Sequence, residues 1–202
     1  TEEFSFSEED KAIARAELAI PDTSVVILYA GRLSFHAKAN PIQMYSCLEQ
    51  AAQQADKEVF LIESGWFAND SIETAFKEAA AQVCPSIKRR VIDGRDKSKK
   101  MNAWAAADIF TSLSDNVQET FGIVPLEAMA AGLPQIVSDW DGYKDTVREG
   151  IDGFRIPTIT PRDGLAGDIA FRHATGTDSY DMYCGNNSSI VSVNEASLTQ
   201  AY

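Results

Sequence analysis

The chain has 202 residues, of which 45% are hydrophobic and 24% charged, and these values are typical of one globular domain and exclude a disordered chain. Its formal net charge of −12 disfavours a nucleic-acid phosphate backbone, so we expect no nucleic-acid partner. The sequence also lacks the run of about eighteen apolar residues that a membrane-spanning helix needs.

The cysteines and the two chain ends give three further expectations. Cys47, Cys84 and Cys184 lie far apart and are odd in number. This spacing suggests neither a zinc site nor a disulfide framework and favours reduced thiols in a cytoplasmic protein. The chain begins at Thr1, and its last residues, 197–202, stop inside a helical pattern. We therefore expect it to be part of a longer protein.

The first predicted elements are a helix and a strand. Residues 1–22 are acidic and helix-prone, with Ser7 before a Glu-rich first turn and Pro21 at the end, which indicates a linker helix. Residues 25–30 form a continuous apolar run rich in β-branched side chains, which predicts a strand buried on both faces of a parallel sheet. Gly31 ends this strand at the edge where such sheets bind ligands.

A loop with two cations follows the first strand. The guanidinium of Arg32 can donate to two phosphate oxygens and the ammonium of Lys38 adds a point charge, so the pair suits a diphosphate. His36, in the same loop, could also approach a diphosphate. The alternative is a solvated loop, which the loop considered alone would favour. Together with the acidic pair described below, the loop favours a phosphate site.

Strands and helices alternate through the middle of the chain. The predicted order is a helix from Asn40, a strand over 58–62, a helix that begins at Asp70 and ends before Pro85, a strand over 90–92 followed by Gly94, and a strand over 109–113. A basic cluster of seven residues lies between these elements: Lys88, Arg89, Arg90, Arg95, Lys97, Lys99 and Lys100. It could steer an anionic ligand or touch anionic lipid, but such a run is more often a solvated face.

Residues 118–132 form the most informative stretch of the sequence. Gly122 can bring the backbone close to a ligand, Pro125 suits the first turn of a helix, and Gly132 stops that helix. The first turn of a helix leaves backbone N–H groups unpaired, so phosphate binds there readily. Glu119 lies before the helix and Glu127 within it.

These two carboxylates complete a pattern that fits a sugar nucleotide. A carboxylate can accept hydrogen bonds from two neighbouring hydroxyls, as in a ribose or a hexose. Phosphate at the helix start and hydroxyls at Glu119 and Glu127 would therefore account for both parts of such a ligand. The alternative is a surface helix with a solvated Glu127 and a capping Glu119.

The last predicted strands lie over 135–138 and 153–157, with a short helix over 143–148 between them. Asp139 and Asp141 form an Asp-x-Asp pattern, which in other proteins holds a metal and a diphosphate. Because Arg32, Lys38 and the helix start already supply positive charge, we interpret both as loop and cap residues and predict no metal. Residues 158–202 are interpreted as a polar tail followed by the start of a truncated helix.

Six short apolar strands alternating with helices predict an α/β fold, an open parallel sheet of about six strands with helices on both faces, over residues 23–157. Tight connections make this sheet Rossmann-like. No Gly-x-Gly-x-x-Gly follows the first strand, which disfavours dinucleotide oxidoreduction.

The motifs resemble those of a known family. Two glutamates separated by seven residues, with Phe121-Gly122 between them, resemble the donor-site signature of the family-four retaining glycosyltransferases, which have two Rossmann-like domains (the GT-B architecture). The likeness continues through Gly132-Leu133-Pro134 and residues 149–154, and it covers roughly residues 25–157. The sequence departs from the family where Ala39 replaces a glycine and where Asp141-Gly142 replaces Gly-Gly.

The resemblance implies a function and a set of roles. The chain would be the C-terminal, donor-binding domain of an enzyme that moves a hexose from a nucleoside-diphosphate sugar to an acceptor hydroxyl with retention, without a metal or cofactor. Arg32 and Lys38 would stabilise the departing diphosphate, Glu127 would hold the ribose and Glu119 would orient the donor sugar. The remaining donor contacts would come from Gly31, Phe121, Gly122, Ile123 and Gly94, the last near the nucleotide base.

The resemblance also sets expectations for partners and alternatives. An acceptor saccharide or lipid-linked acceptor would bind through an N-terminal domain that this chain lacks, with peripheral contact at the inner membrane surface. The chain alone is therefore expected to bind nucleotide and to be inactive. A sugar-nucleotide epimerase or a phosphorylase of the same architecture, and a non-catalytic nucleotide-binding module, are the alternatives.

Overall fold

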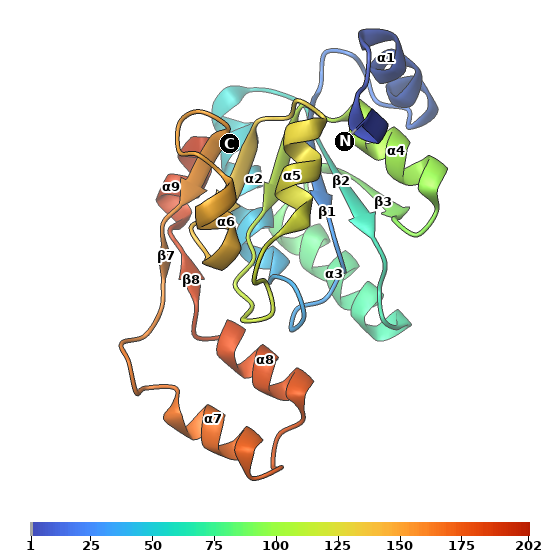
Figure 1. Ribbon diagram of the computed structural model, residues 1–202. Coiled ribbons are helices and arrows are strands. Elements are labelled where there is room, and N and C mark those ends of the chain that lie inside the picture. Colours follow the sequence, from blue (N-terminus) through green and yellow to red (C-terminus); the bar gives the residue numbers. More distant parts are fainter. Residues whose placement is uncertain (1) are drawn as a thin grey trace.

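The computed structural model describes residues 2–202 and has a six-stranded parallel sheet at its centre (Figure 1). The strand order is β3-β2-β1-β4-β5-β6, which is the Rossmann order, so the predicted fold class is confirmed. The strands are β1 (Val25–Ala30), β2 (Val59–Gly65), β3 (Lys88–Asp93), β4 (Ile109–Ser112), β5 (Gln135–Ser138) and β6 (Gly153–Ile156).

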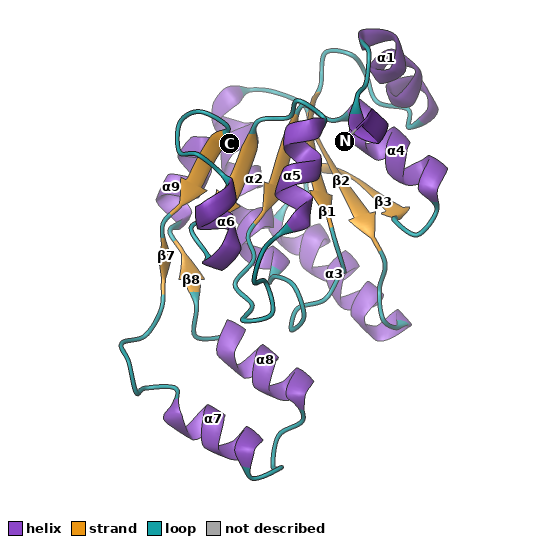
Figure 2. Cartoon of the chain, viewed as in Figure 1, coloured by secondary structure: helices purple, strands orange, loops and turns teal. Residues whose placement is uncertain are grey.

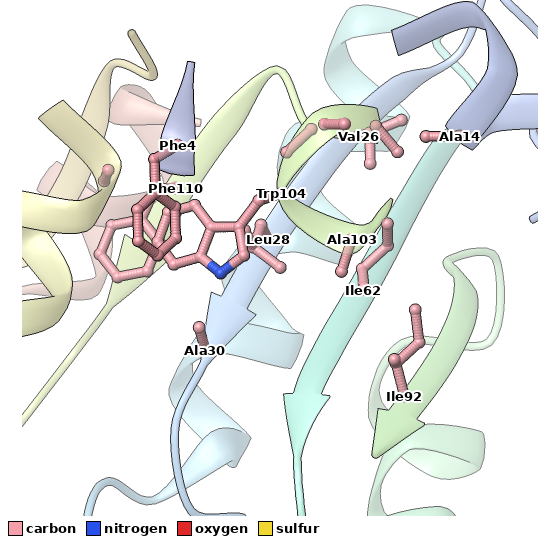
Figure 3. Close-up of a cluster of buried hydrophobic side chains, with 14 of the residues drawn as sticks. Phe4, Ala14, Val26, Leu28, Ala30, Ile62, Ile92, Ala103, Trp104 and Phe110 are labelled. Carbon is pink, nitrogen blue, oxygen red and sulfur yellow. The ribbon is translucent and has the colours of Figure 1, made fainter. Parts of the chain in front are cut away.

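Helices cover both faces of this sheet (Figure 2). They include α1 (Glu8–Glu17), α2 (Pro41–Ala55), α3 (Asp70–Val83), α4 (Lys97–Ala106), α5 (Ile123–Ala130), α6 (Asp141–Thr146) and α9 (Glu195–Ala201). Alternate residues of β1 enter different cores: Leu28 packs in one core with Trp104 and Phe110, and Ile27 packs in the other with Tyr45 (Figure 3 shows the first core). The uninterrupted apolar run in β1 exists because both of its faces are covered.

The sheet order places the loops of interest at one edge. The chain passes from β1 outward to β2 and β3, then returns to β4 on the other side of β1. Connections on the two sides of this reversal diverge, and ligands of such sheets bind there, outside the carboxyl ends of the strands. We call this side the carboxyl edge. The loop 31–40 after β1 and the loop 113–122 after β4 meet at it.

The N-terminal segment is docked on the domain. Ser7 caps α1, because its hydroxyl accepts from the backbone N–H of Asp10 at 3.1 Å and the Asp10 carboxylate accepts from the Ser7 N–H at 2.8 Å. Arg15, which is 5% exposed, donates to Asp108 at 2.7 Å. The predicted helix is therefore present and is held against the start of β4.

The C-terminal segment, predicted as a polar tail, contains several elements. These are β7 (Thr158–Ile159), α7 (Gly167–Ala174), α8 (Tyr180–Ser188), β8 (Ser192–Val193) and then α9. β7 and β8 pair antiparallel, and α9 packs on α2 with Leu198 fully buried. Polarity obscured α7 and α8 in the sequence, because α7 has no buried residue and α8 has only Cys184 and Ser188 buried. None of the described helices is long and apolar enough to cross a bilayer.

Candidate functional site

The carboxyl edge holds a compact cluster of Lys38, Glu119, Tyr143 and Ser112. The Lys38 ammonium forms an ion pair with the Glu119 carboxylate, and the two side chains are only 13% and 15% exposed. The Tyr143 hydroxyl lies 3.3 Å from Glu119 Oε2 and 3.4 Å from Lys38 Nζ. It also lies 2.8 Å from Ser112 Oγ. Four segments, the two loops, the end of β4 and α6, therefore converge on one point.

The protonation states in this cluster follow from its surroundings. Burial alone would lower the pKa of Lys38, but Tyr143 and Glu119 outweigh that effect and raise it above its ordinary value. Burial also raises the pKa of Tyr143, so its hydroxyl stays neutral. The site therefore contains a fixed ammonium beside a single counter-ion at neutral pH. An anionic ligand can compete with Glu119 for that ammonium.

Arg32 reaches toward the same loop as Glu119. Its Nη2 atom lies 3.4 Å from Gln118 Oε1 and 3.4 Å from the carbonyl oxygen of Ala37. Within residues 2–202 the Arg32 guanidinium forms no ion pair, and the residue is exposed. The structure thus brings Arg32, Lys38 and Glu119 together, with one cation open to solvent.

The N-terminus of α5 opens beside this cluster. Gly122 is its N-cap residue with φ +76°, and no side chain caps the helix. A side chain at Gly122 would collide with the ring of Tyr143, so only glycine allows this approach. Phe121 and Ile123 flank the helix start and are 57% and 67% exposed. Unpaired N–H groups of the first turn are available to an anion here.

Glu127 lies one turn further along α5 and has a partner that the sequence analysis did not foresee. Its Oε1 atom accepts from Lys100 Nζ at 3.0 Å, and its side chain is 22% exposed. Lys100 also lies over the ring of Phe4, with Nζ 5.2 Å from the centroid. Glu127 is therefore held in place from α4, and within the described residues its Oε2 atom accepts no hydrogen bond.

Three glycines form a tightly packed backbone surface at the ends of β1, β2 and β3. The N–H of Gly31 donates to Ser64 and the N–H of Gly94 donates to Gly65, both at 3.0 Å. A Cβ atom at Gly94 would lie 3.2 Å from Gly65 Cα, and a Cβ atom at Gly65 would meet the carbonyl group of Gly31. Gly65 was not predicted from the sequence, although a glycine at the end of an apolar strand is a usable signal.

Three candidate residues from the sequence do not contact the Lys38–Glu119 cluster. His36 lies against α8, where a Cβ atom at Gly185 would be 3.0 Å from His36 Cβ. Asp139 lies 3.7 Å from a guanidinium nitrogen of Arg155, and Asp141 is an exposed first residue of α6. Within residues 2–202 no group of three or more His, Cys, Asp or Glu side chains is arranged to hold a metal ion.

The basic cluster is largely neutralised by local ion pairs. Arg89 pairs with the fully buried Glu63, and Lys100 pairs with Glu127. Arg95, Lys97 and Lys99 also pair with neighbouring carboxylates. Most of the positive charge of this cluster is therefore neutralised by carboxylates of the same domain.

Comparison with known proteins identifies the family. Residues 10–170 match the family model described as glycosyl transferases group 1. The chain is 27% identical over 169 residues to a D-inositol 3-phosphate glycosyltransferase of Nocardioides sp., covering 78% of this chain and 36% of that protein. It is 26% identical over 146 residues to the phosphatidyl-myo-inositol mannosyltransferase of Mycolicibacterium smegmatis, covering 72% of this chain and 35% of that protein. It thus spans about a third of the length of these relatives.

Solved structures show the same fold. HepE of Anabaena, in a crystal structure with UDP-glucose, superposes with a TM-score of 0.61 at 20% identity, covering all of this chain and 50% of that one. WaaG, a glycosyltransferase involved in lipopolysaccharide biosynthesis, superposes with a TM-score of 0.56 at 21% identity, covering 90% and 46%. At these identities the likeness concerns the fold alone. The family model covers most of the chain, and the chain therefore belongs to the group 1 glycosyl transferases.

Proposed function

We propose that this chain is the donor-binding domain of a retaining hexosyltransferase that uses a nucleoside-diphosphate sugar. The observation that carries this proposal is the Lys38–Glu119 ion pair beside the uncapped start of α5, next to Arg32, which forms no ion pair within residues 2–202. Family membership favours sugar transfer over the epimerase, phosphorylase and nucleotide-sensing alternatives. HepE, a protein of the same fold, has been crystallised with UDP-glucose, which supports a nucleotide sugar as donor.

Each part of the donor has a matching group. The diphosphate would bind Lys38, Arg32 and the N–H groups of the first turn of α5, and it would displace Glu119 from the ammonium. The released Glu119 carboxylate would then accept hydrogen bonds from the donor sugar, while Glu127 Oε2 accepts from the ribose. The remaining contacts would come from Gly31, Gly94, Phe121, Gly122 and Ile123.

The chemistry follows from this charge arrangement. As the glycosidic bond breaks, negative charge develops on the leaving diphosphate, and cations that already contact it stabilise this charge. Lys38 and Arg32 would supply this stabilisation without a metal or other cofactor. An acceptor saccharide or lipid-linked acceptor would be bound by another domain, so we expect this chain alone to bind nucleotide without turnover. We also propose that the protein is cytoplasmic, with peripheral contact at a membrane surface.

Calorimetric titration with UDP, GDP and ADP tests the donor site. We expect saturable heat from at least one of the three. Arg32→Ala should weaken that binding about ten- to hundredfold, because a charge-assisted hydrogen bond contributes about 1.5–3 kcal/mol. Arg148→Ala is the matched control, since Arg148 is an exposed arginine that pairs with Asp152 before β6, away from the carboxyl edge. Equal effects of the two substitutions, or no heat with any nucleotide at millimolar concentration, would refute the site.

A further inference from the structure

A hollow of about 270 Å³ lies where the C-terminal segment meets the carboxyl edge. Val117 lines it from the loop after β4, and Trp140 lines it from the loop after β5. The opposite wall comes from the segment 160–166, before α7, from Asn187 in the last turn of α8, and from Ile190 and Val191 after it. Figure 1 shows α7 and α8 projecting beyond the carboxyl ends of the strands, so this segment extends the edge outward.

The Trp140 indole is held in one orientation. Its Nε1–H donates to the carbonyl oxygen of Asn116 at 3.1 Å, and the ring remains partly exposed to the hollow. Asn116 is itself fixed, because its side-chain amide donates to the carbonyl oxygen of His36 at 2.5 Å and to Ser188 Oγ at 3.4 Å. A ring that cannot rotate freely loses little entropy when a ligand packs against it.

Polar groups surround this aromatic ring. Arg162 and Asp163 both line the hollow, are exposed, and form no ion pair or side-chain hydrogen bond within the described part of the chain. Asn187 donates its amide to the carbonyl oxygen of Tyr183 at 2.8 Å, which leaves its side-chain oxygen as an acceptor. The hollow therefore combines one aromatic ring with a donor fork, a carboxylate and an amide oxygen.

This combination suits a sugar ring. A pyranose has an apolar C–H face that can pack on an indole and hydroxyls around its rim that need donors and acceptors. The charges of Arg162 and Asp163 cancel, which favours a neutral ligand over a phosphate. The volume is just below the usual range for small-molecule pockets of about 300–1,000 Å³, so it fits a single ring better than a nucleoside diphosphate.

We propose that this hollow is a saccharide subsite that binds one neutral pyranose unit of the acceptor, with Trp140 as its platform. The inference deepens the proposed function and rests on it for the role of that sugar. The loop 116–119 separates the hollow from Lys38 and carries both Asn116 and Glu119. An acceptor unit held here would lie beside the donor site and would contact the same loop, while the rest of the acceptor would be bound by the other domain.

Saturation-transfer NMR with methyl α-D-glucopyranoside and methyl α-D-mannopyranoside tests this subsite, with the acyclic polyol sorbitol as the negative probe. We expect saturable transfer from at least one glycoside, a loss of at least fivefold in Trp140→Ala, and no loss in Trp66→Ala. Trp66 is the matched control because it is another surface tryptophan, 39% exposed, and does not line the hollow. Arg162→Gln/Asp163→Asn, at exposed positions where folding is not threatened, should reduce the transfer as well.

Nucleotide titration of the same samples separates this inference from the donor site. We expect UDP, GDP or ADP to bind Trp140→Ala as they bind the unchanged chain, and an excess of nucleotide not to displace the glycoside. Absence of glycoside transfer, equal transfer in the Trp140→Ala and Trp66→Ala variants, or displacement by nucleotide would overturn the subsite while leaving the donor site intact. Failure of nucleotide binding in the unchanged chain would instead refute the proposed function.

Discussion

Replacing Gly122 by alanine should damage the fold and the candidate site together. A Cβ atom at this position would lie 2.5 Å from Tyr143 Cδ1 and still closer to Cε1. Tyr143 is fully buried and bonds Ser112, so its ring has little room to move. The positive φ of +76° adds a second cost for any residue with a side chain. We estimate about 1–2 kcal/mol for the backbone conformation and about 1–3 kcal/mol for overpacking.

Gly132→Ala provides the matched control for this substitution. Gly132 follows α5 with φ +71°, but a Cβ atom there would meet no atom within 4 Å. Gly132→Ala should therefore lower the free energy of unfolding only by the cost of the backbone conformation, about 1–2 kcal/mol. The difference of about 1–3 kcal/mol corresponds to a melting temperature roughly 2–12 °C lower for Gly122→Ala than for Gly132→Ala.

Urea unfolding and thermal melting of both variants measure this difference. Nucleotide titration should in addition show weaker binding for Gly122→Ala only, because a displaced Tyr143 disturbs Lys38 and Glu119. Equal destabilisation by the two substitutions would refute the close packing of Gly122 on Tyr143. Unchanged nucleotide affinity in a destabilised Gly122→Ala variant would refute the link between this packing and the site.

Two further predictions concern buried charges. Arg89→Met should destabilise the protein by about 3–5 kcal/mol, because it leaves the fully buried Glu63 without its cation. Glu63→Gln/Arg89→Met should recover most of that loss in urea unfolding, and a double variant no more stable than Arg89→Met would contradict the pairing. Burial raises the pKa of Asp115 from its ordinary value of 3.8 to about 7. The folded state therefore binds this proton more tightly than the unfolded state, and stability should fall by at most about 4 kcal/mol as pH rises from about 4 to 7. Asp115→Asn should remove this fall, and parallel stability curves for the two proteins across that range would contradict it.

The strands were predictable from local sequence because the sheet is covered on both faces. β1, β5 and β6 begin at the predicted residues 25, 135 and 153. β2 was predicted too short, since it continues through Glu63 to Gly65. Glu63 is compatible with a buried strand only because Arg89 of β3 and Tyr45 of α2 neutralise and bond it. No local pattern carries that information.

The candidate site was likewise predicted only in part from the sequence. The positions of Arg32, Lys38, Glu119 and the start of α5 were predicted from motifs, because these residues lie in the loops that follow β1 and β4. Tyr143 and Lys100 were missed as partners of Glu119 and Glu127, because each comes from a distant helix and only the fold brings them together. α4 was also missed, since its three lysines within 97–100 conceal the buried face at 103–106.

Backbone amide chemical shifts during titration with a nucleoside diphosphate test the central claim most directly. If Lys38, Arg32 and the first turn of α5 hold the diphosphate, the largest changes should fall on residues 31–38 and on Gly122, Ile123 and Val124. Residues 131–134 and 148–152, on turns that lead into β5 and β6 at the opposite end of the sheet, should change little. Changes concentrated at those turns, or no changes at millimolar nucleotide, would contradict a donor site at the carboxyl edge.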